Sequence, residues 1–271
     1  MTVFDVEIVS SLLDKWIELV VANEVKELDF HLRANKNRMY SLPGTIFSAE
    51  FLTTLKLCGC NLEQSSAYTI SIEIVAPSLQ QCTLACVQMS CVIDMVRCAD
   101  LKYFSLISAG ILDQEFHNLI SKFPLLEKLT MYGCILERVS LSNNQLKELQ
   151  VFHCPRLRVI DIDIPSLLTF FYEFFGNPAR SINAPRTCSW KVRISLHCDG
   201  YDVLISLDSI KKFLEVPYDI EELSISISIQ DMDSYALDKF KKRSPSLPCK
   251  VVNLAIDVLD LQPSNYAALL D

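Results

Sequence analysis

Glycine is scarce in this chain of 271 residues, which contains only 6. Loops that cradle phosphate groups need glycines at fixed spacing, because the backbone must approach the ligand closely. Accordingly, the patterns G-x-x-x-x-G-K-[ST], G-x-G-x-x-G and G-x-S-x-G are all absent from the sequence. These absences remove the usual signals of nucleotide binding and of serine hydrolysis. We expect no enzyme activity and no cofactor.

Positive charge is also in short supply. The 25 Lys and Arg residues are outnumbered by 33 Asp and Glu residues, and the formal net charge is −8. Nonspecific attraction to nucleic acid depends on clustered Lys and Arg. We therefore expect no nucleic-acid partner.

Targeting and membrane signals are missing too. The longest uncharged stretch, residues 74–93, approaches the length of a membrane span but contains Pro77, several Gln and several Ser, which disfavours a bilayer. The first residues lack a basic region followed by an apolar run, and the chain has no Asn-x-Ser/Thr sequon. We expect no membrane partner and a location in the cytoplasm or nucleus, where the 11 Cys remain thiols.

What the chain has instead is a repeated pattern of apolar residues at positions one, four and six. The five clearest copies are Leu52-x-x-Leu55-x-Leu57-x-x-Cys60, Leu79-x-x-Cys82-x-Leu84, Leu101-x-x-Phe104-x-Leu106, Leu126-x-x-Leu129-x-Met131-x-x-Cys134 and Leu146-x-x-Leu149-x-Val151-x-x-Cys154. This is the leucine-rich repeat signature. One short strand per repeat cannot bury its apolar side alone, so neighbouring repeats must stack.

Weaker copies bring the expected number of strands to ten. One copy begins at Val25, and four more follow the central five, with first positions at 167, 187, 220 and 251. The register near Trp190 stays open, because apolar residues alternate without a break from 190 to 196. Either register turns Lys191 and Arg193 outward.

The periodicity predicts an α/β leucine-rich repeat solenoid, with a curved parallel sheet on the concave side and helices and irregular segments on the convex side. Residues 1–24 carry apolar side chains at helical spacing, among them Leu12, Trp16 and Ile17, and are predicted to form a helix that caps the first repeat. Residues 25–271 form the repeat domain. Its last two intervals leave room for convex helices near Phe213 and Phe240.

Short words between the strands carry a resemblance to a known family. They include Leu13-Asp14-Lys15-Trp16-Ile17, Ser41-Leu42-Pro43, Ala76-Pro77-Ser78-Leu79 and Phe123-Pro124-Leu125-Leu126-Glu127-Lys128-Leu129. In this order the chain resembles the leucine-rich repeat region of plant F-box proteins, the group that often carries an FBD segment near the C-terminus. The resemblance implies substrate recognition for a ubiquitin ligase: an F-box docks on a Skp1-type adaptor, and the repeats present a protein target.

Both ends depart from that family pattern. Residues 1–24 are shorter than the helical F-box that the resemblance implies, so we expect this chain alone not to bind a Skp1-type adaptor. After the last strand we expect only a helix over residues 264–270, which indicates a repeat domain truncated at the C-terminus. Two alternatives stay open: the repeat domain of a small-ligand, hormone-type receptor, and a non-functional or decoy fragment.

The cysteines are the residues most suggestive of chemistry. Cys60, Cys134 and Cys154 occupy position nine, where leucine-rich repeats use Asn or Cys to satisfy backbone groups. Cys134 and Cys154 belong to neighbouring repeats and are expected roughly 5 Å apart by strand spacing. No tetrahedral ligand set can be assembled, so no metal is predicted. The pairs His153-Cys154 and His197-Cys198 lack a supporting Asn or Asp, and nucleophilic catalysis is not predicted.

The predicted binding face follows from strand alternation. If positions four and six face inward, positions three, five and seven face the concave surface. Aromatic residues there are candidate anchors, because they desolvate a large area with little entropy loss. The predicted partner-binding residues are Tyr103, Tyr132, Phe152 and Phe171, with Lys128, Glu148 and Arg193 as charged neighbours. Mixed charge favours a protein target, of unknown identity, over a polyanion. The opposing interpretation is that loops or inserts cover the aromatics.

Overall fold

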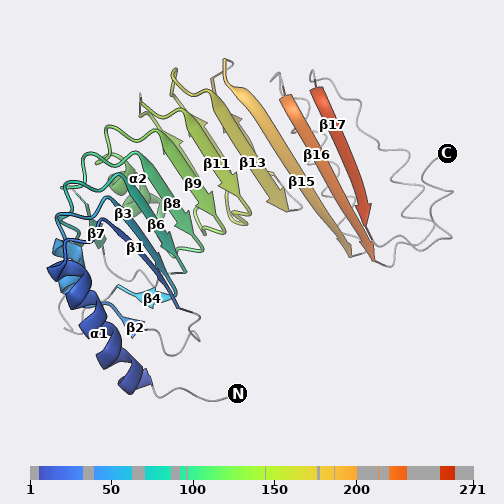
Figure 1. Ribbon diagram of the computed structural model, residues 1–271. Helices are drawn as coiled ribbons and strands as arrows, with labels where there is room; N and C mark the ends of the chain where they lie inside the picture. Colours follow the sequence, from blue (N-terminus) through green and yellow to red (C-terminus); the bar gives the residue numbers. More distant parts are fainter. Residues whose placement is uncertain are drawn as a thin grey trace.

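The main sheet contains ten parallel strands arranged along an arc (Figure 1). The computed structural model describes residues 6–32, 40–62, 71–86, 92–95, 97–143, 145–175, 178–185, 187–199, 213, 220–230 and 251–259. In chain order, which is also sheet order, the strands are β1 (Glu27–His31), β3 (Thr54–Cys58), β6 (Gln81–Ala85), β8 (Tyr103–Ile107), β9 (Lys128–Tyr132), β11 (Glu148–Phe152), β13 (Thr169–Phe175), β15 (Ser189–Asp199), β16 (Ile220–Gln230) and β17 (Val251–Leu259). Each strand carries one of the ten predicted repeats, and the predicted solenoid is confirmed.

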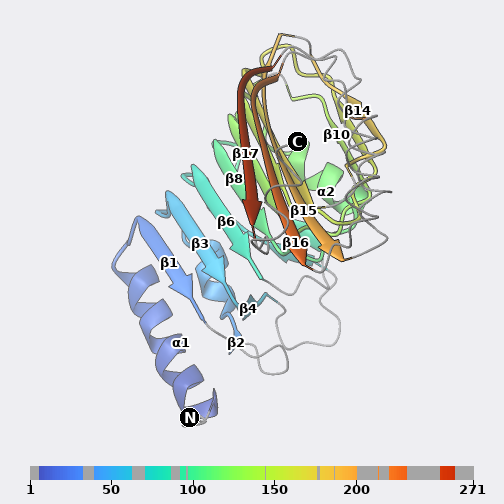
Figure 2. The same cartoon turned by 90° about the vertical axis from the view of Figure 1, so that its right-hand side faces the viewer.

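Shorter elements form the opposite, convex side of the solenoid, where Figure 2 shows α2, β10 and β14. On this side the α-helix α2 spans Asp113–Ile120. Small parallel sheets join β10 (Arg138–Leu141), β12 (Val159–Ile162) and β14 (Ser181–Asn183), β5 (Ser71–Glu73) and β7 (Val92–Asp94), and β2 (Tyr40–Ser41) and β4 (Cys60–Asn61), and a 3-10 helix, η1, covers Gly44–Ser48. In the described part of the chain, this side is built more from short strands and turns than from helices.

The core lies between the two sides and runs continuously through the repeats. Leu55, Leu57, Leu129 and Leu149 are fully buried, as the alternation predicts, because every second side chain of a strand points to the same face. Toward the C-terminal half the core becomes aromatic. The rings of Phe170 and Trp190 meet edge to face at 4.8 Å, a favourable geometry for aromatic pairs.

Successive strands of the main sheet leave it through the same backbone turn. Gly59, Cys86, Ser108, Gly133 and His153 each follow a strand, and all have φ between +48° and +71°. The N–H of each of these residues donates a hydrogen bond to a backbone carbonyl oxygen of the neighbouring strand in the main sheet. The acceptor is the last residue that pairs with the strand just ended, as when Gly59 N–H donates to Ala85 O. Of these positions, residue 59 most strictly requires glycine, since a Cβ there would lie 2.0 Å from the Leu32 carbonyl oxygen.

The N-terminal helix α1 spans Val6–Ala22 and lies beside β1 in both views (Figures 1 and 2). Ile17 is buried in the core, and Tyr40 donates a hydrogen bond to Asp14 Oδ1 at 2.5 Å. The helix ends where Glu24 adopts φ +53° and the N–H of Val25 donates to Val20 O, a Schellman arrangement. The Trp16 side chain does not pack against the core with Ile17 and is 56% exposed.

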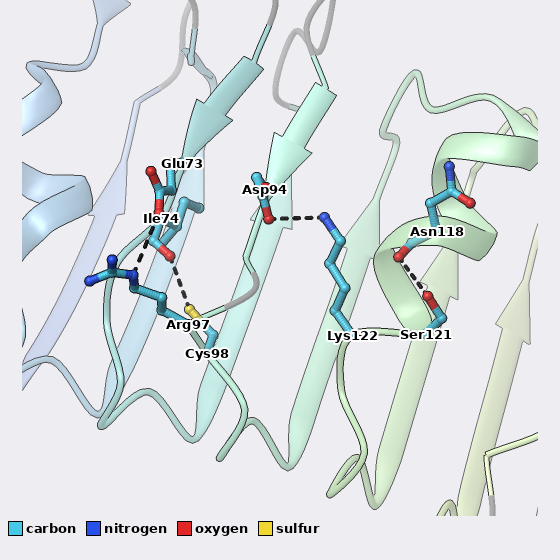
Figure 3. A network of polar contacts seen from close by, with 8 residues as sticks. All are labelled: Glu73, Ile74, Asp94, Arg97, Cys98, Asn118, Ser121 and Lys122. Atoms are coloured by element: carbon cyan, nitrogen blue, oxygen red, sulfur yellow. Dashed lines mark hydrogen bonds and ion pairs between the residues drawn. The ribbon is translucent and has the colours of Figure 1, made fainter.

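Polar contacts tie neighbouring convex segments together (Figure 3). Lys122 Nζ lies 2.9 Å from Asp94 Oδ1, and Arg97 Nε lies 3.7 Å from Glu73 Oε1. The buried thiol of Cys98 donates to the carbonyl oxygen of Ile74 at 3.4 Å. These contacts join one repeat to the next, as expected for an array whose stability depends on nearest neighbours.

Parts of the sequence prediction fall outside the described residues. They are the expected convex helices near Phe213 and Phe240 and the expected helix over residues 264–270. Phe213 itself is described, and its side chain packs in the core against Tyr172 and Phe174. Across the described ranges, no helix has the length and apolar character needed to cross a membrane.

Candidate protein-interaction surface

Outward side chains of the main sheet form three rows across the strands, because the parallel register sets equivalent positions side by side. The first row contains Tyr103, Lys128, Glu148, Thr169 and Ser189. The middle row contains Ser105, Thr130, Gln150, Phe171, Lys191 and Glu222. The third row contains Ile107, Tyr132, Phe152, Glu173, Arg193 and Ser224.

All seven predicted binding residues therefore lie on one face, in two groups. Tyr103, Lys128 and Glu148 are consecutive in the first row, where Lys128 Nζ lies 3.1 Å from Glu148 Oε1. The other four run from β9 to β15. Tyr132, Phe152 and Arg193 lie in the third row, and Phe171 lies in the middle row with its ring centroid 6.5 Å from that of Phe152. Tyr103 and Tyr132 are 44% and 43% exposed, whereas Phe152 and Phe171 are half-buried.

A connected chain of polar and aromatic contacts runs along the third row. The Tyr132 and His153 rings meet edge to face at 5.2 Å. His153 Nε2 lies 3.0 Å from Glu173 Oε1, and Arg193 Nη1 lies 3.2 Å from Glu173 Oε2. The Glu173 side chain is only 12% exposed. Each of its carboxylate oxygens has one close partner, His153 for Oε1 and Arg193 for Oε2.

His153 shares with Cys86 and Ser108 a turn in which a residue other than glycine adopts the left-handed region, with φ of +49° at His153. Such a conformation costs of order 1–3 kcal/mol, and here it belongs to the turn by which successive strands leave the main sheet. From the sequence, His153 was noted only as the neighbour of Cys154. Its position directly after a strand, where Gly59 and Gly133 occur in other repeats, was the available signal.

A cavity of about 160 Å³ opens on this face over β11, β13, β15 and β16. Phe152 and Phe171 supply apolar wall, while Lys191, Arg193 and Glu222 supply charge. Lys191 Nζ lies 2.8 Å from Glu222 Oε1 and 5.4 Å from the centre of the Phe171 ring. The hydrogen bond to Glu222 raises the pKa of Lys191 above its ordinary value. Phe152, Phe171 and Arg193 were predicted as binding residues, whereas Lys191 and Glu222 were not.

Two cysteines of position nine, Cys134 and Cys154, hydrogen bond to backbone carbonyl oxygens, as predicted. Cys134 Sγ donates to Leu106 O at 3.5 Å, and Cys154 Sγ donates to Phe152 O at 3.5 Å. The two thiols are also close enough to hydrogen bond, and this contact lowers the pKa of Cys134 and raises that of Cys154. His153 Nε2 is directed toward Glu173, so the adjacent His153 and Cys154 have separate structural roles. The side chains of His197 and Cys198 lie outside the described residues.

A second thiol and imidazole meet near the N-terminal end of the sheet. His31 Nε2 lies 3.4 Å from Cys58 Sγ. Burial is the main cause that raises the pKa of Cys58, and the neighbouring Cys86 adds to it, so the thiolate needed for nucleophilic attack is disfavoured. Within the described ranges, no group of three or more His, Cys, Asp or Glu side chains is arranged to hold a metal ion.

One strand per repeat, a parallel sheet and a continuous core define a leucine-rich repeat protein. A family model described as At1g61320/AtMIF1, LRR domain, matches residues 54–241, and a second, described as FBD-associated F-box protein At5g56370, LRR repeats, matches residues 13–93. A search of curated proteins found no significant match. Because the first match spans more than half of the chain, the protein belongs to the leucine-rich repeat domain family of At1g61320/AtMIF1. The resemblance to F-box/FBD/LRR-type proteins is confirmed, and leucine-rich repeat families are generally non-enzymatic.

Proposed function

We propose that this chain is a protein-interaction module that recognises a protein target on the concave face of its main sheet. The observation that supports the proposal best is the set of aromatic side chains presented on four successive strands: Tyr103, Tyr132, Phe152 and Phe171. Large exposed aromatics flanked by paired charges are typical of protein-binding surfaces. The role we assign is binding, without catalysis, in the cytoplasm or nucleus.

The biological setting that we propose is target recognition for a ubiquitin ligase. One matching family is named for an FBD-associated F-box protein, and the order of sequence words between the strands carries the same resemblance. In this setting the repeats select the target, and the ligase is recruited by other parts of the assembly.

The hormone-type alternative is less well supported by the cavity. Sites for drug-sized ligands commonly enclose about 300–1,000 Å³, whereas the cavity on the concave face measures about 160 Å³. A space of this size suits one side chain of a protein partner better than a whole small-molecule ligand. We therefore favour a macromolecular target.

The test is affinity capture with the purified chain, followed by measurement of the captured protein's affinity for variants. Replacing Tyr103 and Tyr132 together by Ala should weaken binding by about 2 kcal/mol, or roughly thirtyfold, as expected for hot-spot aromatics. The melting temperature should change little, because both side chains are more than 40% exposed.

Trp16 offers a matched control on the same protein. It is a large aromatic residue that is 56% exposed, but it lies on α1 rather than on the main sheet. The Trp16→Ala variant should bind the captured protein as the unmodified chain does. Equal affinity of the double tyrosine variant and the unmodified chain would exclude Tyr103 and Tyr132 as binding anchors and would count against the concave face as the binding surface.

A further inference from the structure

Three side chains from neighbouring repeats gather near the N-terminal end of the main sheet: His31, Cys58 and Cys86. His31 and Cys58 are the last residues of β1 and β3 and are paired in register, and His31 Nε2 lies 3.4 Å from Cys58 Sγ. The thiols of Cys58 and Cys86 are close enough to hydrogen bond. The cluster therefore brings together two thiols and one imidazole, away from the cavity on the concave face.

The turn that ends each strand explains why Cys86 reaches Cys58. Cys86 is the residue with positive φ that follows β6, as His153 is the one that follows β11. The ring of His153 reaches back to Tyr132, the last residue of the preceding strand, at 5.2 Å. Cys58 is the last residue of the strand that precedes β6 in the sheet. The pair of Cys86 and Cys58 thus repeats the arrangement of His153 and Tyr132.

The backbone spacing suits a disulfide between the two cysteines. Cys58 is paired with Ala85, which by strand spacing lies about 4.8 Å away, and Cys86 is the next residue along. The Cα atoms of Cys58 and Cys86 are therefore roughly 5–6 Å apart, which is the separation that disulfides most often span. In the structure both cysteines are free thiols.

The two thiols differ in their access to solvent. Cys86 is exposed, whereas Cys58 is half-buried, so a small oxidant in solution meets Cys86 first. Burial, with a smaller effect of Cys86, raises the pKa of Cys58, and its proton needs an acceptor before the sulfur can attack. Nε2 of His31 is within reach of that proton and accepts it in the tautomer protonated at Nδ1.

We propose that Cys58 and Cys86 are a modification site at which hydrogen peroxide forms a reversible disulfide. In the first step the Cys86 sulfur attacks one peroxide oxygen, the O–O bond breaks, and Cys86 sulfenic acid and water form. In the second step the Cys58 sulfur attacks the Cys86 sulfur, the S–O bond breaks, and the disulfide and a second water form. His31 takes the proton of Cys58 and passes it to the leaving hydroxide.

The redox balance is complete with peroxide as the oxidant. The two thiols lose two electrons in all, and one peroxide gains two and becomes two waters. Two equivalents of a small thiol reverse the reaction by thiol–disulfide exchange and form their own disulfide. Such transient bonds are the usual kind in reducing compartments. The site is separate from the predicted binding residues and does not depend on a protein target.

The test treats the reduced, purified full chain with hydrogen peroxide at neutral pH, alkylates the remaining thiols and maps disulfides by mass spectrometry. A glutamyl endopeptidase cuts after Glu63 and Glu73, which puts Cys58 and Cys86 on different peptides. The expected product is a linked peptide pair whose fragments place the bond at these two residues rather than at the buried Cys60. Dithiothreitol should remove the link.

Variants separate the two steps. The Cys58→Ser chain cannot complete the second step, so dimedone, which traps sulfenic acid, should label Cys86. The Cys86→Ser chain should show neither a link nor a dimedone adduct at Cys58. His31→Ala should slow formation of the link at least about tenfold, as loss of a positioned base implies. In the His31→Ala, Cys58→Ser double variant, dimedone labelling of Cys86 should be unchanged, because His31 acts only in the second step.

Cys134 and Cys154 provide the matched control on the same chain. Their thiols also hydrogen bond with each other, but Cys134 is fully buried, so this pair should stay reduced while the link between residues 58 and 86 forms. Early formation of that link, reversed by dithiothreitol, supports the proposal. Absence of the link, equal oxidation of the control pair, or no dimedone adduct in the Cys58→Ser chain overturns it.

Discussion

Replacing Gly59 by Ala should destabilise the solenoid far more than the same change at another glycine. Its φ is +71°, and the added Cβ would lie 2.0 Å from the carbonyl oxygen of Leu32. The left-handed conformation costs a residue with a Cβ about 1–2 kcal/mol. Relief of the overlap must move backbone, because the Leu32 N–H is itself bonded to Cys58 O at 2.9 Å, and such overpacking adds about 1–3 kcal/mol. We expect a total loss of about 2–5 kcal/mol.

Two other glycines provide a graded comparison. At Gly133 φ is +63°, but the nearest atom to an added Cβ is Ser108 Oγ at 3.1 Å, which can move, so Ala should cost only about 1–2 kcal/mol. At Gly110 no atom lies within 4 Å of the added Cβ, and Ala should change stability by less than about 1 kcal/mol in either direction.

Urea denaturation followed by far-UV circular dichroism measures all three variants. The expected order of loss is Gly59→Ala, then Gly133→Ala, then Gly110→Ala. The slope of the transition must be compared as well as its midpoint, because a repeat array can lose cooperativity when one interface weakens. Equal losses for Gly59→Ala and Gly133→Ala would refute the argument from close backbone approach.

Three further predictions follow from the core, the thiols and the surface charges. Leu129→Ala should cost about 2–5 kcal/mol in urea denaturation, because the side chain is fully buried and its removal leaves a cavity; a loss below about half a kcal/mol would mean that the neighbours refill the space. Under native conditions a maleimide should label the exposed Cys86 before Cys60, since burial raises the pKa of Cys60 to about 12; early labelling of Cys60, read by peptide mass spectrometry, would contradict this. A carboxyl ¹³C titration should find the pKa of Glu127 below its ordinary value, because Lys147 donates to it at 2.8 Å. The stabilisation from that pair is present above the unfolded-state pKa and is lost as the pH falls through the folded-state pKa, and Lys147→Gln should return the pKa of Glu127 toward normal.

The fold was largely predictable because the repeat fixes which side chains face inward. Leu55 and Leu57, or Leu129 and Met131, can be buried together only in a strand with the predicted orientation, and one strand constrains the next. The strand register near Trp190 could not be chosen from the sequence, but both possible registers place Lys191 and Arg193 on the outward face. Trp16 was less predictable, because helical spacing defines a stripe but does not define how much of it the neighbouring repeat covers.

The candidate site was predictable only in part. Alternation placed Tyr132 and Phe152 outward, but the contact between His153 and Glu173 depends on a left-handed turn in one repeat and on the register of the next. Neither feature has a signal within a single repeat. The pairing of Lys191 with Glu222 likewise joins residues that are separated by a long insert, most of which lies outside the described residues. Contacts between repeats, rather than patterns within them, define the cavity.

The growing length of the strands has a consequence for how the chain folds. The first six strands of the main sheet have five residues each, whereas β15 and β16 have eleven. Longer ladders couple neighbouring repeats more strongly. Closing the 31 residues that separate Lys191 from Glu222, instead of the 20 that separate Glu173 from Arg193, costs only about 0.4 kcal/mol more in chain entropy. We expect folding to nucleate among β13, β15 and β16 and to propagate toward β1. The cavity lies within this nucleus, so the proposed recognition site would form early and would persist when the narrow end of the sheet frays.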